Sequence, residues 1–307
     1  MSKLPLIVIT GPTASGKTGK AVALARAIDA EIISADSRQV YCGMDLGTGK
    51  DLDEYGEVPY HLIDICPAGY KYNLHKYLRD YEQARLDIES RGKNVVLCGG
   101  TGLYVESVVK GIQLPPVPQN AELRNELSGK SLDELTEILK SYKTLRNNSD
   151  IDTCQRAIRA IEICVYYHNN PHLRAVTEPH PLSHVCVIGV DIDRDSRRRR
   201  ISERLQARLD AGMIDEVRRL LDSGVPAQDL IYYGLEYKFV TRHVIGELSY
   251  EEMYTGLETA IHRFAKRQMT WFRGMAQRRG IAINWLPYDL SNTDFVASAL
   301  HLARATP

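Results

Sequence analysis

The segment GPTASGKT, Gly11 to Thr18, constrains the fold of this chain more than any other part of its sequence. It matches the pattern G-x-x-x-x-G-K-[ST] in full. The short, β-branched run at residues 4–10 predicts a strand before it, and KTGKAVALARAI, which begins at Lys17, predicts a helix after it. Because strand, glycine-rich turn and helix form the context that this pattern requires, we predict a phosphate-binding loop at the head of an α/β fold.

A loop of this kind predicts a ligand group. Its backbone N–H groups turn toward a di- or triphosphate at a helix N-terminus, where the helix dipole favours anions. We expect a diphosphate to be bound by Gly11, Thr13, Ala14, Ser15, Gly16, Lys17 and Thr18. The Thr18 hydroxyl is placed to ligate Mg²⁺, the cofactor that we expect. ATPases of this fold usually have an acidic residue that closes an apolar strand and holds the metal. The corresponding strand here, NVVLCGGTG at 94–102, ends in glycines and a threonine, which favours a site in which diphosphate is the leaving group.

Strands and helices alternate through the first third of the chain, which is typical of a parallel sheet flanked by helices. We predict strands at 31–34, 60–64 and 94–98 and a helix at 73–91. A proline-rich exit, LPPVPQ, then leads into residues 121–167, which have helical spacing and no convincing strand. We therefore divide the chain into a first part of the P-loop core at 1–112, a helical insertion at 113–182, and a return to the core with C-terminal helices at 183–307.

The third part is predicted to add one strand to the sheet and then several helices. Residues 185–193 read as that strand, and AINWLP, residues 282–287, as an edge strand. The predicted helices are 196–211, 214–223, 252–279 and a final helix that ends at Ala303. Ser249 and Glu252 have the spacing of a capping box at the start of the long helix.

Bulk composition excludes several classes of protein. The 39 basic side chains balance 39 acidic ones, so any contact with nucleic acid must come from local segregation of charge. The 6 cysteines form no CxxC pair, which suggests neither a zinc site nor a disulfide scaffold. No apolar run approaches the ~20 residues of a membrane span, so we expect a cytoplasmic protein without a membrane partner.

Three polar residues follow strands that should end at the same edge of the sheet. Thr13, Asp36 and Thr101 come after the first, second and fourth predicted strands, and ligands of open parallel sheets bind at that edge. A carboxylate beside a phosphate-bound electrophile can act as general base toward an attacking amine or hydroxyl. Alternatively, Asp36 is a helix N-cap or an indirect metal contact, and Thr101 merely closes a turn.

The chain resembles the tRNA dimethylallyltransferase family, also called tRNA isopentenyltransferases. The resemblance covers roughly residues 4–274 and is most specific in the first third of the chain. It is carried by GPTASGKT, ISADSRQVYCGMDLGTGK (33–50), LCGGTGLYV (97–105), QRAIRAIEI (155–163), DIDRD (191–195), RISERLQARLDAGMIDEV (200–217) and AKRQMTWFRG (265–274). The segment IYYGLEYK, residues 231–238, differs from the glycine-tyrosine-lysine/arginine turn usual in the family.

The resemblance implies a reaction and a role for each matched residue. The donor would be dimethylallyl diphosphate, held with Mg²⁺ by the phosphate loop, and Asp36 would be the general base for attack by the exocyclic amine of adenine. Thr13 and Thr101 would contact diphosphate oxygens, and Arg200 would clamp the leaving group. The acceptor would be the adenosine just 3′ to the anticodon, in the anticodon loop of tRNA.

The resemblance also implies an RNA interface. The residues expected to face tRNA are Asp36, Ser37, Arg38, Gln39, Thr101, Arg124, Gln155, Arg156 and Arg159. Lys266 and Arg267 recur with Arg263 and Arg273 at near-helical spacing, as in a basic RNA-binding face, although a solvated surface is the ordinary alternative. The competing functions are a free-nucleotide (adenylate) prenyltransferase, a P-loop small-molecule kinase and a non-catalytic RNA-binding module. A monomer is compatible with the sequence, which does not specify the oligomeric state.

Overall fold

The computed structural model describes residues 4–114, 116–145, 149–173 and 180–306. It divides the chain into two compact units, one formed by Met1–Lys110 with Pro181–Pro307 and the other by Gly111–His180. The predicted insertion, 113–182, overlaps the second unit closely. Residues 115, 146–148 and 174–179 of that prediction lie outside the described residues, as do 1–3 and 307 of the flanking parts.

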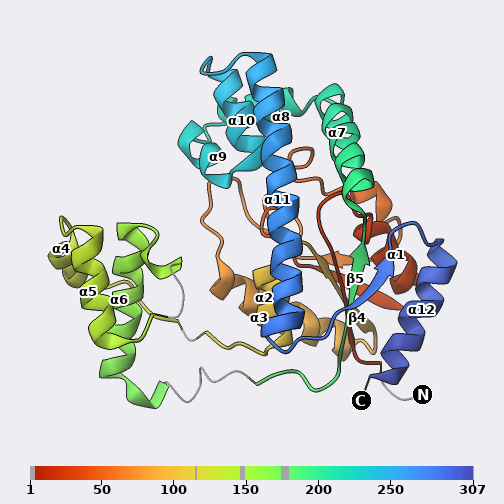
Figure 1. The fold of residues 1–307 in the computed structure, drawn as a ribbon, viewed down its shortest axis with the longest axis horizontal. Helices are drawn as coiled ribbons and strands as arrows, with labels where there is room; N and C mark the ends of the chain where they lie inside the picture. Colours follow the sequence, from red (N-terminus) through yellow and green to blue (C-terminus); the bar gives the residue numbers. More distant parts are fainter. Residues whose placement is uncertain (1–3, 115, 146–148, 174–179, 307) are drawn as a thin grey trace. The chain divides into compact units, whose positions relative to one another are not determined.

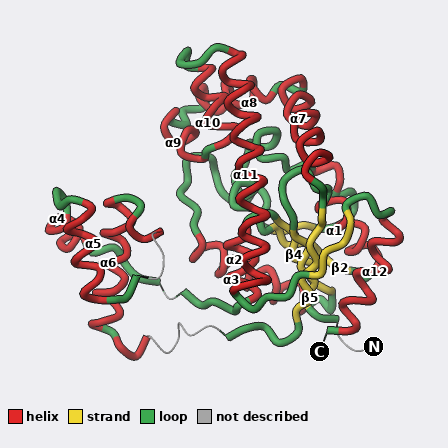
Figure 2. Tube along the Cα trace, in the orientation of Figure 1, coloured by secondary structure: helices red, strands yellow, loops and turns green. Residues whose placement is uncertain are grey.

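The first unit is built on a six-stranded sheet with the strand order β3-β2-β4-β1-β5-β6 (Figures 1 and 2). Every neighbouring pair of strands is parallel. The strands are β1 (Leu6–Thr10), β2 (Ala30–Ser34), β3 (Tyr60–His61), β4 (Asn94–Gly99), β5 (Val185–Asp191) and β6 (Asn284–Pro287). Because all six strands run the same way, their carboxyl ends form one edge, and the predicted α/β class is confirmed.

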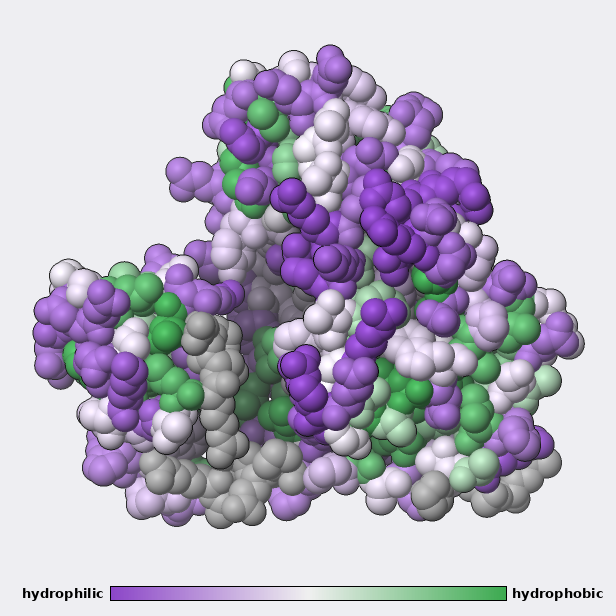
Figure 3. All heavy atoms as spheres, viewed as in Figure 1, coloured by the Kyte–Doolittle hydropathy of each residue, from purple (hydrophilic) through white to green (hydrophobic). Residues whose placement is uncertain are grey.

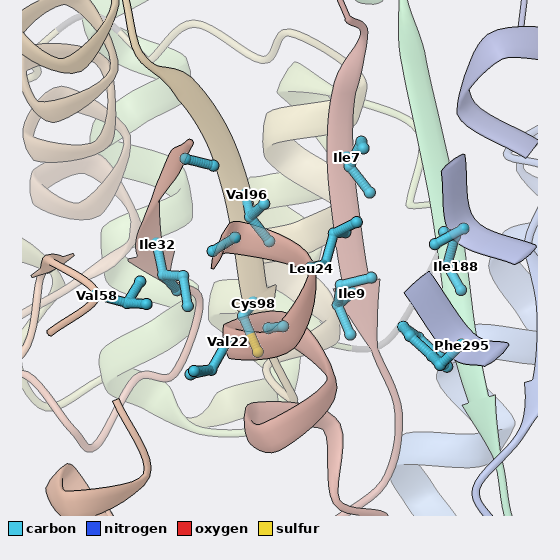
Figure 4. Packing of buried hydrophobic residues seen from close by; sticks show 14 of the residues in the cluster. Ile7, Ile9, Val22, Leu24, Ile32, Val58, Val96, Cys98, Ile188 and Phe295 are labelled. Carbon is cyan, nitrogen blue, oxygen red and sulfur yellow. The ribbon is translucent and has the colours of Figure 1, made fainter. Parts of the chain in front are cut away.

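Alternate residues of the central strands pack on opposite faces of the sheet. Ile7 and Ile9 lie in a core with α1 (Lys17–Ala27) and α12 (Asn292–Ala305), where Figure 4 shows Val22, Leu24 and Phe295 facing the strands. Val8, between them, packs with α2 (Leu74–Ser90), α3 (Gly102–Val109) and the C-terminal half of α11 (Tyr250–Arg278). Burial on both faces explains why these strands are continuous apolar runs.

A layer of helices extends beyond the carboxyl ends of the strands. It contains α7 (Arg194–Asp210), α8 (Met213–Asp222), α9 (Ala227–Tyr233) and α10 (Leu235–Val244), which share a core with the first half of α11. Figure 1 shows α11 running from this layer down to α2 and α3. The predicted capping box is present at its start, where Ser249 and Glu252 bond to each other's backbone. One helix therefore links the helical layer to the sheet.

The second unit is a small helical domain. It consists of α4 (Ala121–Leu127), α5 (Leu132–Tyr142) and α6 (Cys154–Asn169), with single 3₁₀ turns at Ser149–Ile151 and Pro171–Leu173. Leu127, Leu135, Leu139 and Ile161 are each at most 3% exposed and form its core. The described part of this unit contains no strand, as the helical spacing predicted.

Three features of the fold differ from the sequence-based expectation. The strand expected at 60–64 is only two residues long, because Leu62 (φ 62°) and Asp64 (φ 56°) leave the extended conformation. Helix α3 was not predicted, because its residues are buried from Tyr104 to Val109 and therefore show no amphipathic stripe. Helices α9 and α10 were not predicted either, since they are short and meet at a glycine.

A 3₁₀ turn, η1 (Leu52–Glu54), follows β2 along the chain and contributes to the wall of the site described below. None of the described helices is long and apolar enough to cross a membrane.

Candidate active site

The phosphate loop joins β1 to α1, as the motif predicted. Gly16, the N-cap of α1, has φ 81° and ψ 17°, a left-handed conformation that glycine adopts without a steric penalty. Ala14 is also left-handed, with φ 62°. Such residues make the backbone concave and bring successive N–H groups toward one point. The Ser15 hydroxyl is buried with no hydrogen-bond partner in the described structure, so a buried polar group of the loop is left for a ligand.

Two cations lie at this loop. The Lys17 ammonium group donates to the Pro12 carbonyl at 3.4 Å. Burial lowers the pKa of Lys17, although Cys98 and Asp36 oppose the shift. A Cβ added to Gly16 would lie 3.5 Å from Nη2 of Arg200, which places that guanidinium over the start of α1. An anion bound here would meet both charges, and its presence would favour the charged form of Lys17.

Asp36 and Thr101 lie side by side at the ends of β2 and β4. The two strands stay paired up to Ser34 and Cys98, and the Thr101 N–H then donates to the Ala35 carbonyl at 3.1 Å. Oγ1 of Thr101 accepts a hydrogen bond from the Ser37 N–H at 3.0 Å. Oδ1 of Asp36 accepts one from the Arg38 N–H at 2.9 Å, which closes a turn. No helix begins at Asp36, so the N-cap alternative for this carboxylate is wrong.

One cavity of about 1290 Å³ unites the predicted catalytic residues. Its lining includes Thr13, Asp36, Thr101 and Arg200, together with Ala14, Gly16, Lys17 and Thr18 of the phosphate loop; Gly11 and Ser15 are not among its lining residues. The wall continues over the inner sides of α7, α10 and α11. Nine lysines and arginines face five aspartates and glutamates in the lining. The cavity is therefore positively charged overall, although the whole chain is neutral.

Gln268 of α11 is a residue of the site that sequence reasoning missed. Its Oε1 accepts from the Thr13 N–H at 2.8 Å, and its Nε2 donates to the Gly100 carbonyl at 2.8 Å. The side chain is 7% exposed. It joins the phosphate loop to the end of β4. A polar residue at a core-facing position of the long helix, between Ala265 and Phe272, is the signal that could have identified it.

Glu216 was also missed, and it holds the opposite wall of the cavity. Its carboxylate accepts from the N–H groups of Asp45, Leu46 and Gly47 at 2.7–3.1 Å and from the Tyr237 hydroxyl at 2.6 Å. Glu216 is 4% exposed, so these four donors supply nearly all of its solvation. The carboxylate thereby ties α8 to α10 and to the segment that carries Thr48 and Gly49 into the lining.

Part of the predicted RNA interface lines the cavity. Ser37, Arg38 and Arg267 face it, and Gln39 does so with its side chain only 9% exposed. Both ends of the Gln39 amide are already bonded, to the Ser34 hydroxyl and to the Gly49 carbonyl. Lys266 is exposed but is not among the lining residues. In Figure 3 hydrophilic side chains gather over α7 and along α11.

The other predicted RNA contacts belong to the second unit. Arg124 and Arg159 both bind the buried carboxylate of Glu162, which is 2% exposed. Gln155 and Arg156 are exposed near the start of α6, where Arg156 pairs with Asp152 at 2.6 Å. Arg124 and Arg159 therefore also stabilise this unit, whereas Gln155 and Arg156 are exposed on its surface.

Comparison with known proteins assigns the chain to a family. The family described as IPP transferase matches residues 39–275, and the family described as isopentenyl transferase matches residues 4–57. The chain belongs to the IPP transferase family. It is therefore a transferase, and the resemblance predicted from its motifs is confirmed.

Relatives and solved structures agree with this membership. The chain is 59% identical to tRNA dimethylallyltransferase 2 of Bacteroides fragilis over 94% of this chain and 95% of that protein. It is 56% identical to tRNA dimethylallyltransferase 1 of Parabacteroides distasonis over 98% of both. The crystal structure of the full-length tRNA isopentenylpyrophosphate transferase from Bacillus halodurans superposes with a TM-score of 0.72 at 29% identity, covering 99% of this chain and 98% of that one. A eukaryotic dimethylallyltransferase acting on tRNA, at 21% identity and a TM-score of 0.81, shares the fold over 97% of this chain and 77% of its own.

Proposed function

We propose that this transferase moves the dimethylallyl group of dimethylallyl diphosphate to the N6 amine of the adenosine 3′-adjacent to the anticodon of tRNA, and releases diphosphate. The observation that carries the proposal is the joint placement of Asp36 and the phosphate loop in one positively charged cavity. A carboxylate base and a diphosphate site are the two parts that this substitution requires. The names of the curated relatives support tRNA as the acceptor.

The donor diphosphate binds at the start of α1. The backbone of the loop residues that line the cavity, Thr13, Ala14 and Gly16 to Thr18, and the helix dipole offer donors and a positive potential to its oxygens. Lys17 and Arg200 supply full charges. The Thr101 hydroxyl accepts from the Ser37 N–H at 3.0 Å and donates to the Ser37 hydroxyl oxygen at 3.4 Å, and it would exchange this long second bond for one to a diphosphate oxygen.

The reaction is a substitution at the allylic carbon C1. The N6 lone pair forms a bond to C1 while the bond from C1 to the diphosphate oxygen breaks, and its electron pair leaves on the diphosphate. Asp36 accepts the proton that N6 loses. Positive charge develops on the allylic carbon and negative charge on the leaving group, so Lys17 and Arg200 act on charge that grows in the transition state. We expect these cations to affect the rate more than Asp36 does.

Magnesium fits the residues at this end of the cavity. The Thr18 hydroxyl lines the cavity together with the Asp36 carboxylate, and oxygen is the ligand atom that Mg²⁺ prefers. Among the described residues the Thr18 hydroxyl makes no hydrogen bond that would compete with a metal. Thr18 would hold the ion beside the diphosphate, where it would neutralise charge on the leaving group.

The acceptor enters from the side of the cavity lined by α10 and α11. Base chemistry on folded RNA requires the target base to leave its stack, and an anticodon loop presents such a base. Arg38 and Arg267 lie on the lining and can bind phosphates that flank the target. We propose that the protein acts as a monomer, on tRNA in the cytoplasm.

Mass analysis of the product tests the proposal. Purified protein is incubated with dimethylallyl diphosphate, Mg²⁺ and a tRNA transcript with adenosine 3′ to the anticodon, and the nucleosides are analysed. The expected result is a gain of one C5H8 unit on adenosine, and no gain on a matched transcript that carries guanosine at that position. Equal modification of both transcripts would refute the assigned position, and no modification of either would refute the function.

A further inference from the structure

Tyr232 is an exposed aromatic side chain that the proposed reaction does not use. It lies near the C-terminal end of α9. Its side chain is 70% exposed, the highest value among the large apolar and aromatic side chains of the described residues. It belongs to the segment IYYGLEYK, residues 231–238. A single exposed ring is common on protein surfaces, so its surroundings decide whether it has a role.

The corner between α9 and α10 places Tyr232 at the edge of the active-site cavity. The residues that follow it, Tyr233, Gly234, Leu235 and Glu236, all line the cavity. Gly234 has φ 77°, and Leu235 has φ 40°, an unfavourable left-handed conformation for a residue with a side chain. Strain of this kind persists where the surrounding structure fixes the backbone, and it is most frequent at functional sites.

Contacts of Tyr233 with three other residues fix the position of this corner. Its hydroxyl accepts from the Gly69 N–H at 2.7 Å, and its ring centroid lies 4.5 Å from that of the buried Tyr41. The guanidinium of Arg38 lies over the same ring, 5.5 Å from its centroid. The Tyr232 ring lies 6.4 Å from the Tyr233 ring, so it sits beside a residue whose own position these contacts fix. A rigid ring loses little conformational freedom when a flat partner stacks on it.

We propose that Tyr232 is a stacking surface for a nucleobase of the tRNA that neighbours the target adenine. This inference rests on the proposed function. When the target base turns into the cavity, its neighbours lose a stacking partner, and an aromatic ring at the rim replaces it. Arg38, which lines the cavity beside this corner, supplies the positive charge for the phosphate between the two nucleotides.

Binding measurements on three variants test the stacking. Tyr232→Phe keeps the ring, Tyr232→Leu keeps apolar area without a ring, and Tyr232→Ala removes both. The Kd for unmodified tRNA should rise about 5- to 100-fold in the Leu and Ala variants, as for loss of one base–aromatic stack, and stay near the wild-type value in the Phe variant. Tyr250→Ala is the matched control: Tyr250 is 47% exposed in the first turn of α11, it is not in the cavity lining, and its removal should leave the Kd unchanged.

A fluorescent base locates the contact. An anticodon stem-loop RNA carries 2-aminopurine next to the target adenine, and its emission is expected to be quenched by wild-type protein and by Tyr232→Phe but not by Tyr232→Leu. The unchanged affinity of all variants for dimethylallyl diphosphate verifies their folding. Wild-type Kd and quenching in Tyr232→Leu and Tyr232→Ala would overturn the inference while leaving prenylation of tRNA intact, whereas failure of the wild-type protein to prenylate tRNA would refute the proposed function itself.

Discussion

Gln268 and Thr13 are separated by 255 positions in the chain, yet Oε1 of Gln268 accepts a hydrogen bond from the Thr13 N–H at 2.8 Å. The same amide group donates to the Gly100 carbonyl at 2.8 Å. One side chain of α11 therefore fixes the spacing between the phosphate loop and the segment that carries Thr101. In the proposed function, the position of the diphosphate relative to the sheet edge would therefore depend on a helix near the other end of the chain.

Replacing Gln268 should impair donor binding. Gln268→Ala leaves a buried N–H and a buried carbonyl unsatisfied, at a cost of about 1–3 kcal/mol in the free energy of unfolding for each such group. The KM for dimethylallyl diphosphate should rise about tenfold, which corresponds to ~1.4 kcal/mol. Gln268→Glu keeps the acceptor for Thr13 but adds a negative charge beside the diphosphate, so its KM should rise further. Steady-state kinetics with the donor varied gives the answer, with the exposed Gln206→Ala as control; a wild-type KM in both Gln268 variants would contradict this role.

Loss of the Asp36 carboxylate should slow the chemistry and spare RNA binding. Asp36→Ala should lower kcat about 10²- to 10⁴-fold, the range expected for a general base, while the Kd for tRNA stays nearly unchanged. Single-turnover prenylation and a filter-binding assay measure the two quantities separately. Asp53→Ala is the control, because Asp53 is an exposed carboxylate that does not line the cavity. An equally large loss of tRNA affinity in Asp36→Ala would contradict a role as general base and show that the carboxylate acts in tRNA binding.

Arg267 and Lys266 should differ in their effect on RNA affinity. The two neighbours are both exposed, but only Arg267 lines the cavity. Removing a phosphate contact should weaken tRNA binding and reduce the slope of log K against log salt concentration by about 1. We expect this of Arg267→Ala, a smaller effect of Lys266→Ala, and the largest effect of the double variant. A salt slope that is the same in all three and in the wild type would make this part of α11 an ordinary solvated surface.

The stability of the insertion should depend on pH through Glu162. Burial opposes ionisation of this carboxyl group, but hydrogen bonds from Arg124, the Asn120 N–H and Arg159 prevail and lower its pKa from 4.5 to about 2. A carboxyl group whose pKa is lowered by folding stabilises the folded state at pH values above the pKa that it has in the unfolded chain. The lowered pKa of Glu162 corresponds to ~3 kcal/mol in the free energy of unfolding. This stabilisation is present above about pH 4.5 and is lost as the pH falls toward 2.

Amide hydrogen exchange of residues 121–142 and 154–169 checks this prediction. After correction for the intrinsic effect of pH, protection in the wild type should fall between pH 4.5 and 2.5. Glu162→Gln should already be poorly protected at pH 7 and should show little further change. Protection that is equal in the two proteins at pH 7 would show that the network adds nothing to the stability of this unit.

Arg124→Ala would disturb the same network and would therefore change both the stability of the insertion and its surface. Arg156→Ala is the cleaner test of RNA binding by the insertion.

The sequence predicted the parts of the site that are encoded locally. Gly16, Lys17 and Thr18 form a contiguous motif with a single structural context, and Asp36 follows a strand whose end is fixed by the sheet. The role of Gln268 could not be predicted because it depends on a contact between distant segments. The same holds for Glu216, whose backbone ligands at 45–47 carry no side-chain signature.

The elements of the fold that could be predicted were also the ones with local sequence signals. Continuous apolar runs and a capping box predicted the central strands and α11, since their signals lie within a few turns of chain. Helix α3 is buried around most of its surface and has no polar stripe to reveal it, and the early end of β3 depends on the left-handed Leu62. The corner at Gly234 divides two short helices whose packing, rather than local periodicity, defines them.

The central claim is that the cavity transfers a prenyl group to tRNA, and one competition experiment tests it most directly. The protein is incubated with labelled dimethylallyl diphosphate, Mg²⁺, unmodified tRNA and an excess of AMP in one tube, and the label is separated between polymer and mononucleotide. For the wild-type protein, the proposed function predicts label in tRNA alone. In a parallel reaction with Asp36→Ala over the same period, it predicts no label in tRNA or in AMP. Label in AMP, or transfer to tRNA at the wild-type rate without Asp36, would contradict it.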